Sequence, residues 1–288
     1  MNVLVLGGAS YDELIHVDAD ALEKTTYFAK KTYYGLGSTG IGKAIPLFQL
    51  GITTTLHYCI GSDEAGRKIK EELSQFDFKQ IVDTSERSET HTNIMYSSGE
   101  RTSIYTSTLG KVNQLSYDQI EEAIKNADMI FFNIIPYNKS LIPLLRTYTK
   151  KIWVDLHDYD GSNPYHQDFI DIADALFLSK EALSHPEEWI ETMKNKKDFI
   201  VLTKGQDGSE YYDKVKSLQI PAYLSSHVKD TNGAGDHFMA GFFYGYMLGR
   251  NAETCMKLGA YTAKLCVESE NIYSTALCED ALDFVFRK

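Results

Sequence analysis

The sequence lacks long apolar runs and a surplus of basic residues. Its 288 residues are 43% hydrophobic, enough to fill a core, but no apolar run reaches the length of a transmembrane helix. There are 29 Lys and Arg against 40 Asp and Glu, which gives a formal net charge of −11. Nucleic acids and anionic membranes are bound through basic surface, so the composition argues against both as partners. We therefore expect a soluble protein.

Cysteine is scarce and shows no paired spacing. No Cys-x-x-Cys pair occurs and no histidine stands at zinc-ligand spacing, so we expect reduced core thiols at Cys59, Cys255, Cys266 and Cys278. No Pro/Ser-rich linker, low-complexity segment or repeat divides the chain, which favours a single domain over 1–288. Residues 1–7 read directly as a strand without a basic leader, so no signal peptide is indicated and a cytoplasmic location is expected.

Short β-branched or apolar runs alternate with longer amphipathic stretches, which predicts an α/β fold with a mostly parallel sheet. The predicted strands are 3–6, 53–59, 129–134, 151–155, 175–178 and 199–203. The predicted helices are 41–50, 66–74, 117–126, 140–148, 164–172, 237–248 and 252–268. Two regions, 12–34 and 90–108, depart from this alternation, and the second reads as a hairpin of 92–96 and 101–106. Such strands form either a lid over a site or a plain edge sheet.

The most informative stretch is Lys-Asp-Thr-Asn-Gly-Ala-Gly-Asp at 229–236, which precedes an apolar segment. Gly233, Ala234 and Gly235 carry little side chain, so their N–H groups can converge on a charged oxygen at a helix N-terminus. Asp236 then lies in the first helical turn, where a carboxylate can act as base in phosphoryl transfer to a hydroxyl. The alternative interpretation is a Gly-rich turn capped by an acidic residue.

This motif resembles the C-terminal signature of the ribokinase-like (PfkB) carbohydrate kinases. Four further segments resemble that family in chain order, namely the sugar-binding strand at 8–12, the turn at 60–66, the lid hairpin at 98–101 and the nucleotide-side turn at 202–208. The resemblance implies a ribokinase-like three-layer α/β/α core with a mostly parallel central sheet. It also implies a small β-strand lid formed from about 12–36 and 90–108.

A Gly-rich segment at 37–44, Gly-Ser-Thr-Gly-Ile-Gly-Lys-Ala, satisfies most of a P-loop pattern. Ala44 has no hydroxyl for Mg²⁺ and 30–34 is a poor buried strand, so we reject that interpretation. The overlapping Gly-x-Gly-x-x-Gly at 35–40 is weaker still as a dinucleotide fingerprint.

The family has a Gly-rich turn, an Asn and a helix at this place, so 37–42 is interpreted as the turn and 44–51 as the helix. Gly42 stands where the family has its sugar-contacting Asn, which we expect to leave space for a bulkier acceptor and to make ribose a poor substrate. Lys43 either points inward toward an anionic acceptor or faces solvent. The resemblance implies acceptor-binding roles for Asp12, Gly37, Gly40, Gly42, Lys43 and Arg101.

The resemblance also implies a nucleotide and metal side. Its nucleotide-binding candidates are Ser179, Thr203, Lys204, Gly205, Asp207 and Gly208. Ser179 and Ala182 replace the Asn and Glu of the family's metal-organising Asn-x-x-Glu, so Asp155 and Glu181 are the remaining candidates for the Mg²⁺ site. The Asp-Leu-His-Asp cluster at 155–158, which includes His157, can equally be a plain polar loop. Asp230 and Asn232 are implied ligands of a monovalent cation such as K⁺.

Together these features predict an ATP- and Mg²⁺-dependent kinase that phosphorylates a primary hydroxyl of a sugar or sugar-like molecule. Asp236 would act as general base, and the glycine turn would form the anion hole. The alternatives are a nucleoside kinase of the adenosine type and a ligand-binding member of the fold with weakened catalysis. A homodimer through the lid is a further expectation.

Overall fold

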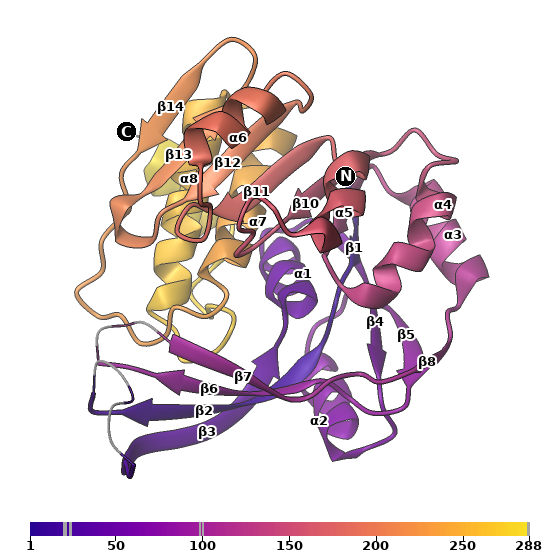
Figure 1. Cartoon of the computed structure of the whole chain (residues 1–288), viewed down its shortest axis with the longest axis vertical. Coiled ribbons are helices and arrows are strands. Elements are labelled where there is room, and N and C mark those ends of the chain that lie inside the picture. The colour runs from indigo at the N-terminus through magenta and orange to yellow at the C-terminus, as the bar shows by residue number, and fades with distance from the viewer. Residues whose placement is uncertain (20–21, 23–24, 98, 100, 287–288) are drawn as a thin grey trace.

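In the computed structural model, the described residues form one ten-stranded and one four-stranded sheet (Figure 1). The structure describes every residue except 20–21, 23–24, 98, 100 and 287–288. The large sheet has the order β14-β13-β12-β11-β10-β9-β1-β4-β5-β8. Its strands are β1 (Asn2–Leu6), β4 (Thr53–Ile60), β5 (Lys79–Ser85), β8 (Val112–Gln114), β9 (Met129–Phe132), β10 (Lys151–Asp155), β11 (Ala175–Ser179), β12 (Phe199–Thr203), β13 (Ser209–Tyr212) and β14 (Ser217–Ile220). All pairings from β12 to β5 are parallel, and β13, β14 and β8 join antiparallel at the edges.

Helices cover both faces of this sheet, because its central strands are apolar on both sides. Val3 and Val5 of β1 enter one core cluster, whereas Leu4 and Leu6 enter the other. The first cluster is covered by α1 (Thr39–Gln49), α2 (Glu64–Leu73), α7 (Ala234–Met247) and α8 (Ala252–Val267). The second is covered by α3 (Tyr117–Asn126), α4 (Ile142–Leu145), α5 (Gln167–Ile172) and α6 (Pro186–Met193). The result is the three-layer α/β/α core that the family resemblance implies.

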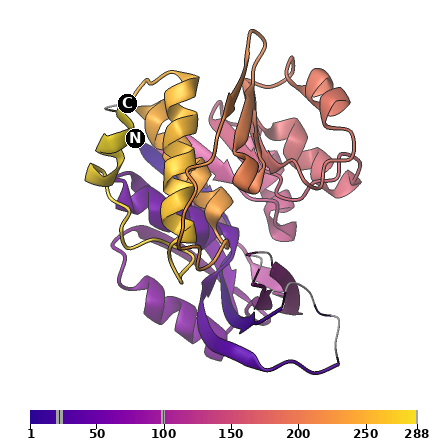
Figure 2. The same cartoon turned by 90° about the vertical axis from the view of Figure 1, so that its left-hand side faces the viewer.

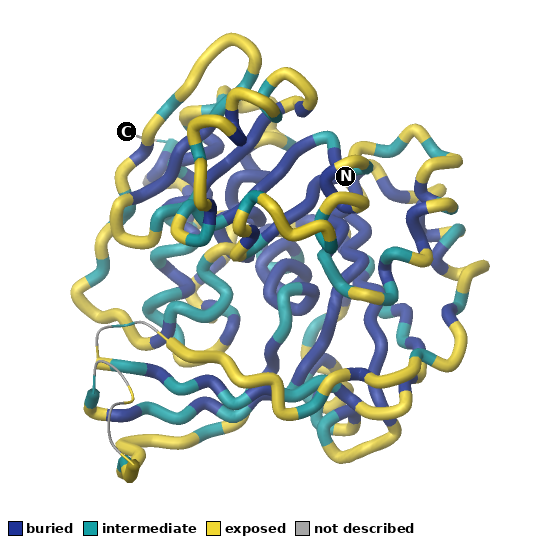
Figure 3. Tube along the Cα trace, in the orientation of Figure 1, coloured by how far each residue is buried: buried dark blue, intermediate teal, exposed yellow. Residues whose placement is uncertain are grey.

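The four-stranded sheet is the lid. Its order is β3 (Ala29–Gly37), β2 (Ser10–Val17), β6 (Thr90–Met95) and β7 (Arg101–Ser107), so two segments far apart in the sequence lie side by side (Figures 1 and 2). β2 pairs parallel with β6, and the outer strands pair antiparallel. The outer strands β3 and β7 of the lid are mainly exposed, whereas its inner strands β2 and β6 are buried or partly buried (Figure 3). Ser98 and Glu100 of the expected hairpin turn lie outside the described residues.

Several boundaries differ from the sequence prediction. α1 begins at Thr39, so Gly40 and Gly42 lie inside a helix rather than in a turn before it. The predicted helix at 140–148 is a 3-10 helix over Pro136–Leu141 followed by the single turn of α4. The strands β5, β8, β13 and β14 and the helix α6 were not predicted.

The structure also tests two expectations from composition, namely the state of the cysteines and the absence of a membrane-spanning helix. All four cysteines are free, but Cys278 is exposed and is therefore not the core thiol that we expected. Among the described residues, no helix is both long enough and apolar enough to cross a bilayer. The homodimer through the lid stays a prediction.

Candidate active site

Three parallel strands end in polar residues at one edge of the large sheet. β10 ends at Asp155, β11 at Ser179 and β12 at Thr203. Ser179 lies opposite Thr203 in the register of the two strands, and the N–H of Ser179 donates to the carbonyl of His157. Ligands of open α/β sheets bind outside the carboxyl ends of the strands, so we place the candidate active site at this edge.

The N-terminus of α7 carries the candidate base. Gly233 precedes the helix with a φ of 78°, and a Cβ there would lie 2.8 Å from the carbonyl oxygen of Ile272, so the fold itself requires glycine. Asp236 lies in the first turn, as the sequence predicts, and its side chain is buried, with only 5% of the residue exposed.

Only some of the backbone N–H groups that precede Asp236 donate hydrogen bonds to the protein. The N–H of Ala234 donates to the carbonyl of Thr231 at 3.3 Å, so one of the three expected amides is engaged. Within the described part of the chain, the N–H of Gly235 has no protein acceptor outside the helix, and a Cβ added to Gly235 would meet nothing within 4 Å. The open space at Gly235 is where an anion held by this turn would lie.

Lys43 joins the helix α1 to the candidate base. It is completely buried, and its Nζ contacts Oδ1 of Asp236 and lies 3.1 Å from Oδ2 of Asp155. Burial opposes the charge of this ammonium, but the two carboxylates outweigh burial and raise the pKa of Lys43. Burial also raises the pKa of Asp236, against the opposing effect of Lys43. Lys43 therefore neither faces solvent nor projects freely toward an acceptor, which corrects our expectation.

Glycine in α1 allows this close approach. A Cβ added to Gly42 would overlap Oδ2 of Asp236, and one added to Gly40 would overlap the backbone of Gly8. The expectation that Gly42 leaves room for a bulkier acceptor is therefore wrong, because the carboxylate of Asp236 fills that room. Gly40 and Gly42 instead let α1 pack tightly against β1 and α7.

The carboxylate of Asp12 in the lid is buried and already accepts hydrogen bonds from other side chains. Its Oδ2 accepts from Nδ1 of His91 at 3.0 Å and from Nδ2 of Asn93 at 3.3 Å. Burial opposes a charged imidazole, but Asp12 and Glu89 outweigh it and raise the pKa of His91 to about 9. The sequence analysis missed His91 and Asn93, although their period-2 spacing in β6 places both on the buried face of the lid.

The ring of Tyr105 lies beside this cluster. Its centroid is 4.2 Å from that of His91, and 64% of Tyr105 is exposed. An exposed aromatic ring next to a buried Asp and His can stack on a sugar or a base.

The loop before α7 is tied to the lid and contains a buried carboxylate. Arg101 donates to the side chain of Asn232, and the hydroxyl of Thr231 donates to the carbonyl of Gly99. Asp230 is 2% exposed, its Oδ1 accepts from the N–H of Asn232, and burial raises its pKa. Its Oδ2 is buried without a hydrogen-bond partner among the described residues, an arrangement that fits a cation ligand.

The candidate nucleotide residues lie at the ends of β11 and β12. Nζ of Lys204 is 2.9 Å from the buried carboxylate of Glu210, so this ammonium is already paired. Gly205 and Gly208 have positive φ values of 53° and 90°, which shape the turn after β12 together with Asp207. Glu181 is exposed, and a Cβ added to Gly205 would lie 3.5 Å from its Oε1, so it borders the same turn.

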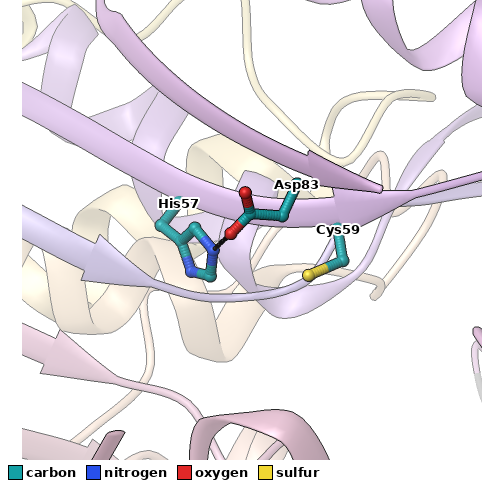
Figure 4. A group of neighbouring side chains, drawn as sticks. All are labelled: His57, Cys59 and Asp83. Atoms are coloured by element: carbon teal, nitrogen blue, oxygen red, sulfur yellow. Dashed lines mark hydrogen bonds and ion pairs between the residues drawn. The ribbon is translucent and has the colours of Figure 1, made fainter. Parts of the chain in front are cut away.

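A second cluster of possible metal ligands lies on the α3 face of the sheet (Figure 4). Nε2 of His57 is 2.9 Å from Asp83, whose carboxylate also accepts from the N–H and hydroxyl of Ser116. Burial raises the pKa of the Cys59 thiol to about 12, so this thiol is neutral in the metal-free protein. The carboxylate of Asp83 already has both oxygens engaged by His57 and Ser116. We assign this cluster to packing and to holding the start of α3.

Known proteins resemble this chain over most of its length. Residues 3–277 match the model of the pfkB family carbohydrate kinase. The acarbose 7(IV)-phosphotransferase of Actinoplanes sp. is 25% identical over 268 residues, which cover 90% of this chain and 89% of that protein. A nucleoside kinase of Methanocaldococcus jannaschii is 24% identical over 83% of this chain and 81% of its own length.

Solved structures show the same fold. A microbiome-derived acarbose kinase has a TM-score of 0.86 at 22% identity, with 100% of this chain and 99% of that chain covered. The ribokinase of Arabidopsis thaliana, complexed with ribose and ATP, has a TM-score of 0.78 at 20% identity, with 99% and 98% covered. Both likenesses show the ribokinase-like fold with its lid.

Proposed function

Because this chain belongs to the pfkB family of carbohydrate kinases, we propose that it transfers the γ-phosphoryl group of ATP to a primary hydroxyl of a sugar or sugar-like acceptor. The observation that carries this proposal is the position of Asp236. Its carboxylate lies in the first turn of α7, one residue after the open space at Gly235. A base beside an anion-binding helix N-terminus is what phosphoryl transfer to a hydroxyl requires.

In this mechanism Asp236 accepts the proton of the acceptor hydroxyl as the hydroxyl oxygen attacks the γ-phosphorus. The turn Gly233–Gly235 stabilises the charge on the transferred group, and the N–H of Gly235 is the amide best placed to do so. Asp12 accepts a hydrogen bond from a hydroxyl of the acceptor. His91 donates to the carboxylate of Asp12 and keeps it in position. Residues 203–208 border the nucleotide. The ammonium of Lys204 is paired with Glu210, and this pairing holds the turn in place.

Two cation sites complete the proposal. Mg²⁺ bound with ATP would neutralise charge on the phosphates, and Asp155 and Glu181 are the carboxylates that border its expected place. The monovalent cation would take the buried and unpartnered Oδ2 of Asp230 as a ligand. That ion would place positive charge behind the anion-binding turn.

The acceptor class rests on the relatives and on Tyr105. Relatives of similar identity act on acarbose or are nucleoside kinases, so both classes are candidates. The exposed ring of Tyr105 beside His91 would stack on a pyranose face or on a base. A catalytically weakened member of the fold is disfavoured, because Asp236 and its glycines are intact.

An ATP-consumption screen with ribose, fructose, fructose phosphate, adenosine and acarbose tests the proposal. We expect a neutral sugar or glycoside to be phosphorylated best and ribose poorly, because no amide side chain is available at Gly42. With the best acceptor, Asp236→Asn should lower kcat by a factor on the order of 10²–10⁴ and change KM little. Wild-type turnover in that variant would mean that Asp236 only caps the helix.

A further inference from the structure

Lys43 is a cation completely enclosed beside the proposed base. It comes from the second turn of α1, whereas its two partners come from the end of β10 and the start of α7. The three charges therefore join three elements that are far apart in the sequence. Within the described residues, Lys43 is the sole hydrogen-bond partner of the Asp236 carboxylate.

The two carboxylate oxygens of Asp236 have different neighbours. Oδ1 is held by the ammonium of Lys43, and Oδ2 lies against the backbone of Gly42, where a Cβ would overlap it. With Oδ1 fixed, the rotation of the carboxylate is fixed, and Oδ2 is the oxygen left for the acceptor hydroxyl. Lys43 is in turn fixed by Asp155 at 3.1 Å, whose Oδ1 accepts from the N–H of His157.

The charge count argues against a purely structural ion pair. One ammonium faces two carboxylates, and both carboxylates are nearly as buried as Lys43 itself. The imidazole of His157 also lies 3.6 Å from Oδ2 of Asp155. Burying charges costs more than the pairing returns in many proteins, so an apolar set of similar volume would hold these elements together at lower cost. Lys43 can balance the charge of one carboxylate only, so a second carboxylate keeps its negative charge. A base needs that charge, and Asp236 is the proposed base.

We propose that Lys43 is a positioning residue for phosphoryl transfer, which holds Oδ1 of Asp236 so that Oδ2 faces the acceptor hydroxyl. The inference rests on the proposed function, since it assigns the residue that orients the proposed base. Lys43 does not bind the acceptor in this scheme. Its removal should lower kcat and leave the binding of ATP unchanged.

The experiment uses the full-length chain with ATP and the best acceptor of the screen above. Lys43→Met removes the charge at similar volume, but it leaves two buried carboxylates without a partner and can unfold the protein. We therefore pair it with Asp155→Asn and compare the double variant with Asp155→Asn alone, both at saturating Mg²⁺, because Asp155 also borders the expected Mg²⁺ site. Thermal unfolding is recorded for every variant, and kcat and KM are measured for each folded one.

We expect kcat of the double variant to lie at least about tenfold below that of Asp155→Asn, with KM for ATP within about twofold, because misplacing a catalytic group by about 1 Å can cost on the order of 10²-fold. Equal kcat in these two folded proteins would overturn the inference and leave Lys43 as a structural counter-ion. Asp236→Asn separates the two proposals. If its kcat falls as expected while removal of Lys43 has no effect, only the role of Lys43 fails. Wild-type turnover in Asp236→Asn would refute the role of Asp236 as base, and no ATP consumption with any acceptor of the screen would refute the proposed function itself.

Discussion

Arg101 in the lid donates a hydrogen bond of 2.7 Å from Nη1 to Oδ1 of Asn232 in the loop before α7. A second bond, from the hydroxyl of Thr231 to the carbonyl of Gly99, lies beside it. The acceptor side and the anion-binding turn are therefore joined directly. We expected Arg101 to bind the acceptor and Asn232 a cation, whereas here they bind each other.

The first prediction concerns this connection. Arg101→Met should raise KM for the acceptor by about 5- to 30-fold, since a hydrogen bond from a charged group contributes about 1–2 kcal/mol. The melting temperature should change little, because Arg101 is on the surface. Steady-state kinetics measure the effect, with Arg67→Met on the exposed face of α2 as control. An unchanged KM would show that the lid does not depend on this bond.

The second prediction concerns the helix packing at the base. Gly42→Ala should lower kcat by a factor on the order of 10², because the new Cβ would overlap Oδ2 of Asp236 and displace the carboxylate. Gly35→Ala is the matched control, since a Cβ there meets nothing within 4 Å. Circular dichroism melting checks that both variants fold. If Gly42→Ala kept full turnover, the carboxylate would have room to shift without loss of function.

Much of the core could be predicted from sequence because its signals are local. The run at 229–236 predicts the placement of Asp236 in the first turn of α7, since glycines and a following apolar segment mark a helix start. Central strands such as β10 and β12 are short apolar runs that end in polar residues, so their bounds were predicted to the residue.

The rest depends on contacts between distant segments. Nothing near Lys43 in the sequence indicates that its partners lie 112 and 193 residues away. The burial of Lys43 follows from the way α1, α7 and β10 meet, and the same packing removes the space that we expected at Gly42. The edge strands β13 and β14 are only four residues long and carry Ser, Glu and Gln among their apolar residues, so the pattern that marks a buried strand is weak there.

The third prediction concerns the metal. Ser179 and Ala182 replace the residues expected to organise Mg²⁺, so activity should require Mg²⁺ but saturate at unusually high concentration. Ala182→Glu should lower the half-saturating Mg²⁺ concentration, and Ala182→Gln, which adds similar volume without charge, is the control. Kinetics as a function of free Mg²⁺ decide the matter. Tight saturation in the wild-type protein would mean that Glu181 or Asp155 already provides the anchor.

The last prediction concerns the pH dependence of stability. His91 faces Asp12 in β2, Glu89 just before β6 and Tyr105 in β7, and, against the effect of burial, the two carboxylates raise its pKa to about 9 in the folded protein. A pKa above the unfolded value of about 6.5 means that the charged pair stabilises the fold fully below about pH 6.5 and that this contribution, at most about 3 kcal/mol, is lost as the pH rises through about 9. His91→Gln should therefore be less stable than the wild type at pH 6, with the gap narrowing toward pH 9.5. Urea unfolding of both proteins across this range measures the gap. A difference that stays constant with pH would show that the pKa of His91 is the same in the folded and the unfolded protein, so that its side chain stabilises the lid only by packing and hydrogen bonding.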